Sequence, residues 1–496
     1  MSLLRRALTV SGWTLVSRVL GLVRDRLFAG AFGASFMLDA FMLSFQLPNL
    51  LRNLFGEGAL STAFIPRYVQ LRDRDPAQAE RFAGSVLARL ALWLSLFCGL
   101  AMAVAAGCVL WGPPRLVIVA HLSLPQLPFM IFICVSAIMA GILNGRRHFF
   151  VPAFAPVVLN LCLIATVWMD AESELWALPY AVLAAGITQV LLHGWALART
   201  GGVPPASLAS SVELVELRRA TLPVVFSSSI YQINALLDTV IAYTFLGLAA
   251  EGAVAILYFG NRLLQFPMAL LTHGVGTAAY PELSSRAGQG WAATGEGLRQ
   301  ATKVLAFFLL PAAVGLFVTA EPLVRTIYQT GRFGEASVER TILVTQMLAI
   351  ALLPISLAKL QTRCFHAHRD QATPMRLSLL QVGLNLLLNL LLVQTSLREA
   401  GLALATAISS VVGSVAYAVL LRRRGAGWAL PAGLWRPLLA SLAMGGVVWA
   451  VLHWWPQAAG RASGYAALRL GSVVVIGAAV YVAIAGLGWL RRPRPG

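Results

Sequence analysis

The sequence predicts an all-α polytopic integral membrane protein, and three observations carry that prediction. Of its 496 residues, 58% are hydrophobic and only 12% are charged, whereas soluble domains are about 25% charged. Mean hydropathy is +0.76. The apolar residues are collected in runs of about 20, the length of a helix that crosses a bilayer. Composition therefore argues strongly against a soluble multidomain protein.

Apolar runs separated by glycine, proline and charge predict about 14 transmembrane helices. They lie at 8–31, 35–62, 83–112, 117–144, 151–169, 175–198, 221–246, 252–279, 301–320, 340–364, 374–396, 400–421, 433–454 and 466–490. An even number of crossings leaves both chain termini on the same side of the membrane.

Arginines in alternate loops predict which side that is. The basic loops contain Arg67, Arg72, Arg74 and Arg81; Arg146 and Arg147; Arg199, Arg218 and Arg219; Arg286 and Arg299; Arg363, Arg369 and Arg376; and Arg422, Arg423 and Arg424. The intervening loops are poor in arginine or acidic, as at Asp170, Glu172 and Glu174. By the positive-inside rule, the basic loops and both termini are cytoplasmic. Topology thus explains the net charge of +18, and no nucleic-acid partner is expected.

Two short motifs recur along the chain. STAFIP at 61–66 recurs as GTAAYP at 276–281, and LNL at 159–161 recurs at 384–386. Repeated halves with a site at their interface are a common plan of transporters. We therefore predict an N-terminal lobe at 1–200 (helices 1–6), a C-terminal lobe at 201–425 (helices 7–12), and two further helices at 426–496.

The first two predicted helices carry charges that lipid does not tolerate. Arg18 and Arg24 lie in the first helix, and Asp39 and Arg52 lie in the second. A charged side chain at bilayer depth costs about 2.5–3.5 kcal/mol on insertion scales. We therefore expect these side chains to face a wet cavity or a partner.

Arg18 and Arg24 do not share a narrow helix face. They are about 120° apart on an ideal helix, so both can face one cavity only across a broad face or a local unwinding. The alternative for Arg24 is a local cluster with Asp25 and Arg26 near the outer surface.

The seventh and eighth predicted helices repeat this theme. The seventh carries Ser227, Ser228, Ser229, Gln232, Asn234 and Asp238. The serines are interpreted as hydrogen-bond partners of other helices, whereas the Asp238 carboxylate needs a partner or a proton. Asp238 is therefore the candidate for ion or proton coupling. On the eighth helix, Arg262 is another intramembrane cation, close to a helix break at Pro267 that is tolerable beside a cavity.

The predicted cavity is net positive and favours a polyanionic substrate. It combines Arg18, Arg24, Arg52 and Arg262 with Asp39 and Asp238. Guanidinium groups bind phosphate in bidentate fashion. The chain has no phosphate-binding loop of the GxxxxGK[ST] type, so transport must use an ion gradient, the membrane potential or the substrate's own gradient. The five cysteines lack Cys-x-x-Cys spacing, and neither a metal site nor a catalytic residue is predicted.

Several sequence blocks resemble the MurJ/MviN family of lipid II flippases within the MOP exporter superfamily. They are SRVLGLVRD (17–25), LPNLLRNLFGEGALSTAFIP (47–66), LNGRRHFFVPAFAPVVLN (143–160), NRLLQFP (261–267) and GTAAYPELS (276–284). The resemblance implies two lobes around a central cationic cavity, with helices 13 and 14 forming a groove for a polyprenyl tail.

The same resemblance implies a function. The family moves lipid II, an undecaprenyl-diphosphate-linked peptidoglycan precursor, from the inner to the outer leaflet of the bacterial cytoplasmic membrane by alternating access. Its substrate-binding residues match Arg18, Arg24, Arg52, Arg262 and Asp39 here. The resemblance also implies coupling to sodium or membrane potential, no organic cofactor, and a setting among membrane lipids and the cell-wall synthesis machinery. Gln265 and Asn53 depart from charged residues of some relatives.

Three other functions compete with this one. Another exporter of the superfamily could carry a different undecaprenyl-linked glycan or drugs, although exporters of cationic drugs would need intramembrane carboxylates to dominate. A membrane enzyme acting on a polyprenyl lipid would need clustered carboxylates, and the pair Asp73 and Asp75 lies in an arginine-rich loop instead. A purely structural protein leaves the buried arginines unexplained. We therefore predict a transporter and not an enzyme.

Overall fold

The computed structural model is helical throughout the part of the chain that it describes. It describes residues 3–56, 59–169, 175–209, 211–246, 251–427, 433–455 and 463–486. The acidic loop at 170–174 and the C-terminal arginines, from which topology was predicted, lie outside these ranges, as do the side chains of Ser227 and Ser228. The chain divides into two compact units, Met1–Tyr243 and Thr244–Gly496.

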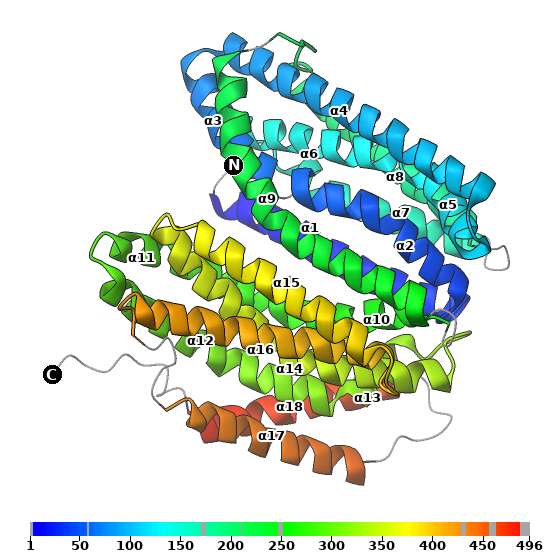
Figure 1. The fold of residues 1–496 in the computed structure, drawn as a ribbon, viewed down its shortest axis with the longest axis vertical. Coiled ribbons are helices and arrows are strands. Elements are labelled where there is room, and N and C mark those ends of the chain that lie inside the picture. The colour runs from blue at the N-terminus through cyan, green and yellow to red at the C-terminus, as the bar shows by residue number, and fades with distance from the viewer. Residues whose placement is uncertain are drawn as a thin grey trace. The chain divides into compact units, whose positions relative to one another are not determined.

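The helices of each unit run side by side (Figure 1). Unit 1 contains α1 (Leu3–Phe32), α2 (Phe36–Leu51), the π-helix η1 (Arg52–Gly56), α3 (Ala59–Arg74), α4 (Pro76–Trp111), α5 (Pro114–Gln126), α6 (Phe129–Gly145), α7 (Phe150–Met169), α8 (Ala177–Arg199) and α9 (Val212–Ile241). The π-helix η2 (Ala242–Leu246) follows α9 across the unit boundary.

Unit 2 holds the remaining elements. These are α10 (Ala253–Pro267), the π-helix η3 (Met268–Thr272), α11 (His273–Ala287), α12 (Trp291–Val318), α13 (Ala320–Tyr328), α14 (Glu335–Ala367), α15 (Ala372–Leu392), α16 (Glu399–Arg423), α17 (Trp435–Trp454) and α18 (Ser463–Ala485). Every predicted transmembrane helix coincides with one helix or with a consecutive group such as α2–η1–α3. The short helix α13 was not predicted.

Ten helical segments in the described ranges are long and apolar enough to cross a membrane. The predicted spans that fall outside this group are 8–31, 35–62, 221–246 and 252–279. These four contain the candidate site residues, and π-helices interrupt or end three of them. Polar residues in a membrane protein are tolerated where they face protein or water, so the least apolar spans are where a polar pathway is expected.

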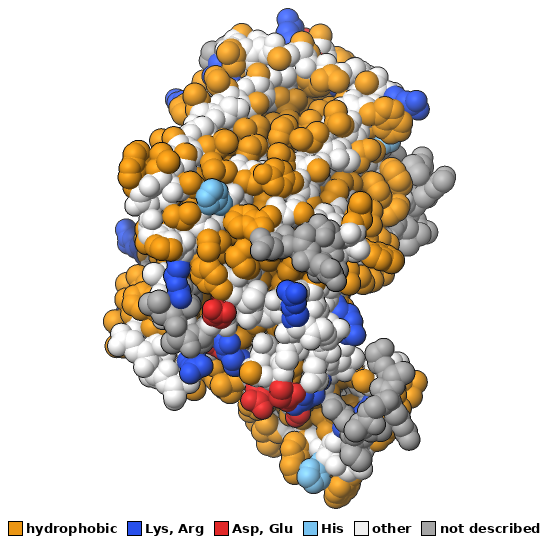
Figure 2. All heavy atoms as spheres, turned by 90° about the vertical axis from the view of Figure 1, so that its right-hand side faces the viewer, with side chains coloured by type: hydrophobic (Ala, Val, Ile, Leu, Met, Phe, Trp, Pro, Cys, Tyr) orange, Lys and Arg blue, Asp and Glu red, His pale blue; other side chains and the backbone are white. Residues whose placement is uncertain are grey.

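Most of the displayed surface is hydrophobic (Figure 2). Large apolar side chains such as Trp93, Leu100 and Trp111 on α4 point outward and are exposed. Exposed apolar area of this extent is unusual for a soluble protein. It is the surface that a lipid environment requires.

Helix α9 packs within unit 1, against α2, α3 and α4. Its first turn is tied down by two polar contacts: Arg67 on α3 pairs with Glu216 at 2.6 Å, and Gln78 on α4 donates to Glu213 at 2.9 Å. By its contacts, α9 belongs to unit 1. The predicted lobes at 1–200, 201–425 and 426–496 instead follow the repeated sequence motifs, which place this helix in the second lobe. The lobe division therefore remains a prediction.

Helices α6 and α14 end in the same way, 222 positions apart (369 − 147). Arg147 and Arg369 both have positive φ, 63° and 58°. The next backbone N–H in each case reaches back to a helix carbonyl: His148 to Leu143 at 2.8 Å, and Asp370 to Phe365 at 3.0 Å. A left-handed residue outside glycine is uncommon. Its recurrence at matched helix ends agrees with the internal repeat predicted from the sequence.

The segments that follow α8 and α16 provide a second local correspondence. A Cβ on Gly84 of α4 would overlap the carbonyl oxygen of Pro205, and a Cβ on Gly295 of α12 would overlap that of Ala426. In each unit, a backbone segment therefore crosses a helix where only glycine leaves room.

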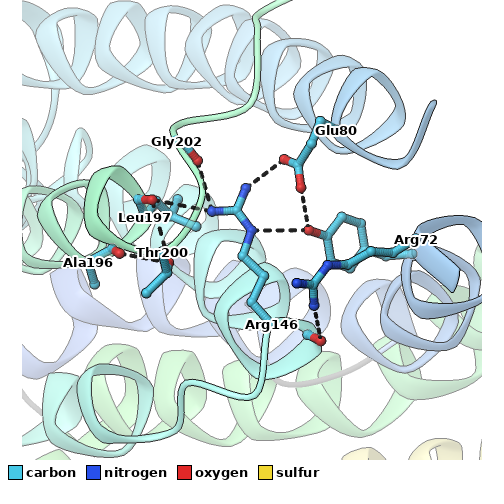
Figure 3. A network of polar contacts seen from close by, with 9 residues as sticks. Arg72, Glu80, Arg146, Ala196, Leu197, Thr200 and Gly202 are labelled. Atoms are coloured by element: carbon cyan, nitrogen blue, oxygen red, sulfur yellow. Dashed lines mark hydrogen bonds and ion pairs between the residues drawn. The ribbon is translucent and has the colours of Figure 1, made fainter. Parts of the chain in front are cut away.

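A buried arginine organises the predicted cytoplasmic end of unit 1 (Figure 3). The Arg146 side chain is 2% exposed and pairs with Glu80 at 2.6 Å. It also donates to Tyr68 Oη at 3.3 Å and to the carbonyl oxygens of Leu197 and Gly202. Tyr68 in turn donates to Glu80 at 2.7 Å. One guanidinium thus joins α3, α4, α6 and the segment after α8.

The pKa values in this network follow from burial and pairing. Burial raises the pKa of the Tyr68 phenol to about 12, so it remains a donor at neutral pH. Burial by itself lowers the pKa of Arg146, but its hydrogen bonds to Tyr68 and Glu80 outweigh that and raise the pKa overall.

Candidate functional site

Arg24 is held at the packed interface of α1 and α7. Its guanidinium donates through Nε and Nη2 to Oδ1 of Asp25, at 3.0 and 2.7 Å. Nη1 donates to Oδ1 of Asn160 on α7 at 3.1 Å. Asp25 is fully buried and the Arg24 side chain is 13% exposed. Arg24 therefore pairs with Asp25, as one of the two interpretations of the sequence expected. Asn160 of α7 is a further partner of Arg24.

Asn160 orients this arginine from the opposite side. Its Nδ2 donates to the backbone oxygen of Ser17 at 3.1 Å, which leaves its Oδ1 directed at Arg24. Sequence reasoning did not select Asn160. The available signal was the repeated LNL motif, because Asn160 is the asparagine of its first copy.

Arg18 occupies a different environment from Arg24. Helix α1 continues without a break from Leu3 to Phe32, so no local unwinding turns the two side chains to one side. Arg18 is exposed, whereas Arg24 is largely buried. The two arginines therefore stand at different positions around the helix, as the 120° separation predicts.

Asp39 lies buried in the first turn of α2. Tyr243 experiences the charges of both Asp39 and Arg115, and its hydroxyl donates to the backbone oxygen of Arg115 at 3.0 Å. The Tyr243 ring stacks on Phe36 at a centroid distance of 5.6 Å, and the Arg115 guanidinium lies 5.3 Å from the Phe36 centroid. Asp39 thus belongs to a polar and aromatic group that the sequence did not reveal.

Arg52 lies in the π-helix η1, where the helix geometry changes after Pro48 of α2. Its Nη2 is 3.5 Å from Oδ1 of Asn53. Asn53 donates in turn to Gln232 of α9 at 3.3 Å. Asn53, which departs from a charged residue of some relatives, therefore links η1 to α9.

Asp238 and Arg262 lie on separate units. Asp238, on α9 of unit 1, accepts a hydrogen bond from Asn234 one turn earlier, at 3.3 Å. Arg262 is half-buried on α10 of unit 2, and the break expected at Pro267 takes the form of the π-helix η3. The structure brings Arg24 to Asp25 and Asn160, and Arg52 to Asn53. The shared cavity of all six residues stays a prediction.

The chain is similar to known proteins over nearly its whole length. A family model described as lipid II flippase MurJ matches residues 28–464. A probable lipid II flippase MurJ of Rhizobium tropici is 30% identical and covers 98% of this chain and 94% of its own length. The lipid II flippase MurJ of Burkholderia cenocepacia is 32% identical over 86% of this chain and 85% of its own.

Solved structures support the fold. A lipid II flippase MurJ in an inward closed conformation aligns with a TM-score of 0.79 at 23% identity, covering 97% of this chain and 98% of that one. An inward-facing multidrug resistance MATE transporter of the MOP superfamily aligns with a TM-score of 0.65 at 14% identity, covering 82% and 94%. The all-α polytopic fold predicted from the sequence is confirmed.

Proposed function

Because the chain belongs to the lipid II flippase MurJ family, we propose that it translocates lipid II from the inner to the outer leaflet of the bacterial cytoplasmic membrane. It is a multi-pass membrane transporter and not an enzyme. Its substrate is an undecaprenyl-diphosphate-linked glycopeptide, and alternating access moves the headgroup past a cationic surface.

The buried Arg24 is the observation that carries this proposal. A diphosphate carries about two charges and must cross roughly 30 Å of hydrocarbon, where each charge costs several kcal/mol. A guanidinium prepositioned by Asp25 and Asn160 can replace the water around a phosphate without being reorganised. Arg18, Arg52 and Arg262 supply further positive charge, and Asp39 limits the excess.

The remaining elements have roles consistent with this. Asp238 is our candidate for coupling transport to a monovalent cation or to the membrane potential, and no organic cofactor is needed. Helices α17 and α18 pack through Met444, Val448 and Tyr481 against Phe307 of α12, and we assign their surface to the polyprenyl tail. Both termini are cytoplasmic, and partners beyond lipid II belong to the cell-wall synthesis machinery.

The proposal is tested in bacteria depleted of their own flippase. The cells carry this chain, its Arg24→Ala variant or its Arg262→Ala variant, and lipid II in the outer leaflet is measured. We expect exposure to be restored by the unchanged chain and lost in both variants. Arg74→Ala, at an exposed position at the end of α3, is the matched control and should behave as the unchanged chain does.

Two other outcomes separate the parts of the proposal. If the unchanged chain inserts into the membrane but restores no lipid II, the substrate is wrong, and other undecaprenyl-linked glycans are assayed next. If the variants are as active as the unchanged chain, the cationic pathway is wrong although the substrate stands.

A further inference from the structure

Two cations on α14 have no role in the site described so far. Lys359 and Arg363 are four residues apart, so their Cβ atoms lie on one helix face about 5–6 Å from each other. Both are half-buried. Arg363 is one of the arginines that the sequence places in a basic loop, and no role was predicted for Lys359. The structure instead includes both in the continuous helix Glu335–Ala367.

Helix α11 is shaped to accept the Arg363 side chain. A Cβ on Gly276 would overlap Nη1 and Cζ of Arg363 and would lie 2.8 Å from Nη2. The guanidinium therefore lies against the backbone of α11 at a position where only glycine leaves room. One turn further along α11, Tyr280 is exposed, as is Thr277. A ligand can thus approach this face.

The pair carries uncompensated positive charge. Lys359 experiences the like charge of Arg363, and no carboxylate within the described ranges forms an ion pair with either side chain. Asp370, beyond the end of the same helix, is engaged by Thr373 at 2.7 Å and by Arg424 at 3.5 Å. Half-buried like charges are costly, and an anion between them would remove that cost.

The equivalent helix pair of unit 1 has no charged side chain at the two matching positions. Aligned on their common ends, α6 places Ala137 and Gly141 where α14 has Lys359 and Arg363. There Gly141 packs on Phe64 and Ile65 of α3, and a Cβ added to it would lie 3.4 and 3.3 Å from their side chains. At these two positions the helices pack without a charged side chain, so the helix pairing does not by itself require a cation at either one.

We propose that Lys359 and Arg363, with Gly276 and Tyr280 beside them, form a phosphate-binding subsite for the diphosphate of the polyprenyl lipid. This rests on the proposed function. Lys359 lies eight residues, or about 12 Å, inside the predicted cytoplasmic end of α14. That is the level at which a lipid headgroup of the inner leaflet meets hydrocarbon, so the subsite receives the diphosphate on entry.

The test is a binding measurement with undecaprenyl diphosphate and the full-length chain in nanodiscs of neutral phosphatidylcholine. We compare the unchanged chain with Lys359→Gln/Arg363→Gln. Loss of two charge-assisted hydrogen bonds is expected to weaken binding about tenfold or more. The control Arg376→Gln/Arg423→Gln removes two exposed cations near the same end of the unit and should bind as the unchanged chain does.

A substitution that keeps both charges guards against a purely structural effect. Gly276→Ala should displace the Arg363 guanidinium and weaken binding severalfold, but it should cost nothing further in an Arg363→Gln background, where the clash is relieved. Lys359→Arg/Arg363→Lys should retain most of the binding. Equal losses from Gly276→Ala in both backgrounds would overturn the assignment of Arg363.

Parallel titrations with phosphatidylglycerol and inorganic pyrophosphate distinguish the sources of phosphate. A loss confined to undecaprenyl diphosphate supports the subsite. If the double variant loses phosphatidylglycerol binding to the same extent, the pair binds bulk lipid and the proposal is overturned. A loss of binding for inorganic pyrophosphate alone also overturns it. Unchanged diphosphate binding in the double variant, beside an unchanged chain that exposes lipid II in cells, refutes the subsite while the proposed function stands. Absence of lipid II exposure refutes the proposed function, and the binding comparison still decides the subsite.

Discussion

The two units place their charges on different pairs of helices. In unit 1, Arg24 meets Asp25 and Asn160 between α1 and α7. The positions of α6 that match Lys359 and Arg363 are occupied by Ala137 and Gly141. In unit 2, the α11–α14 pair carries Lys359 and Arg363. The second LNL asparagine, Asn385, lies 3.4 Å from Thr406 and from Ser409. The two units thus share helix ends and crossing segments but carry their charged side chains at different positions.

The helix ends that the sequence predicts to be cytoplasmic also differ. Arg146 follows α6, and its counterpart after α14 is His368. Arg146 binds four groups in a buried network, whereas His368 stacks on Trp291 at 3.7 Å and hydrogen-bonds Thr294 at 2.9 Å. The end of α6 is therefore held by a buried ion pair, whereas at the end of α14 the His368 ring is accompanied by the more exposed pair of Arg424 and Asp370.

The largest predicted effect is a loss of stability when the residue at either helix end is replaced by alanine. Arg146→Ala removes the ion pair of Glu80, which keeps only its hydrogen bond from Tyr68, and should cost about 3–5 kcal/mol. His368→Ala removes one stack and one neutral hydrogen bond and should cost about 1–2 kcal/mol. Thermal unfolding in detergent compares the two. Equal losses would mean that the helix ends are held alike, contrary to the structure.

A pair of glycine substitutions should instead act equally in both units. Gly84→Ala and Gly295→Ala each force a Cβ onto a backbone carbonyl of a crossing segment and should cost about 1–3 kcal/mol. A Cβ added to Gly99 of α4 or to Gly446 of α17 would meet nothing within 4 Å, so Gly99→Ala and Gly446→Ala serve as controls. If the unfolding midpoint falls in only one of the two variants, Gly84→Ala or Gly295→Ala, the two crossing segments do not correspond.

A smaller effect is predicted for the partner of Arg24. Asn160→Ala removes a charge-assisted hydrogen bond and should lower lipid II exposure about tenfold. Because both side chains belong to one contact, its effect should be far smaller in an Arg24→Ala background. Fully additive losses in the double variant would show that Asn160 acts independently of Arg24.

The sequence predicted the helices well because a run of about 20 apolar residues has the length of a helix that crosses a bilayer. Helical spacing also separates Arg18 and Arg24 by about 120° around α1, and their sharing of one cavity stays a prediction. The sequence missed the contacts of Arg24 with Asn160 and of Asp39 with the Tyr243 group, because these join residues that are far apart in the sequence. It passed over Lys359 because one lysine hardly alters the hydropathy of a 33-residue helix.

The smallest predicted effect is a pH dependence of stability that arises at His368 in unit 2. Burial lowers the pKa of His368 below its ordinary value of 6.5. The unfolded chain therefore takes up a proton at this position before the folded chain does, and stability falls as the pH drops through about 6.5. Unfolding measured from about pH 8 to pH 5 should show this decline, and His368→Phe should reduce it. A decline of the same size in the variant would assign it to other groups.

The uneven apolar character of the helices has a consequence for biogenesis. A translocon releases a segment into lipid according to its own hydrophobicity, and the ten apolar segments meet that condition by length and composition. Helices α1 and α9 carry charged residues in their predicted spans, and η1 and η3 interrupt two other spans. We expect these four to enter the bilayer only together with a neighbour synthesised later. The spans that carry the proposed substrate-binding residues would then leave the insertion machinery later than the apolar spans next to them.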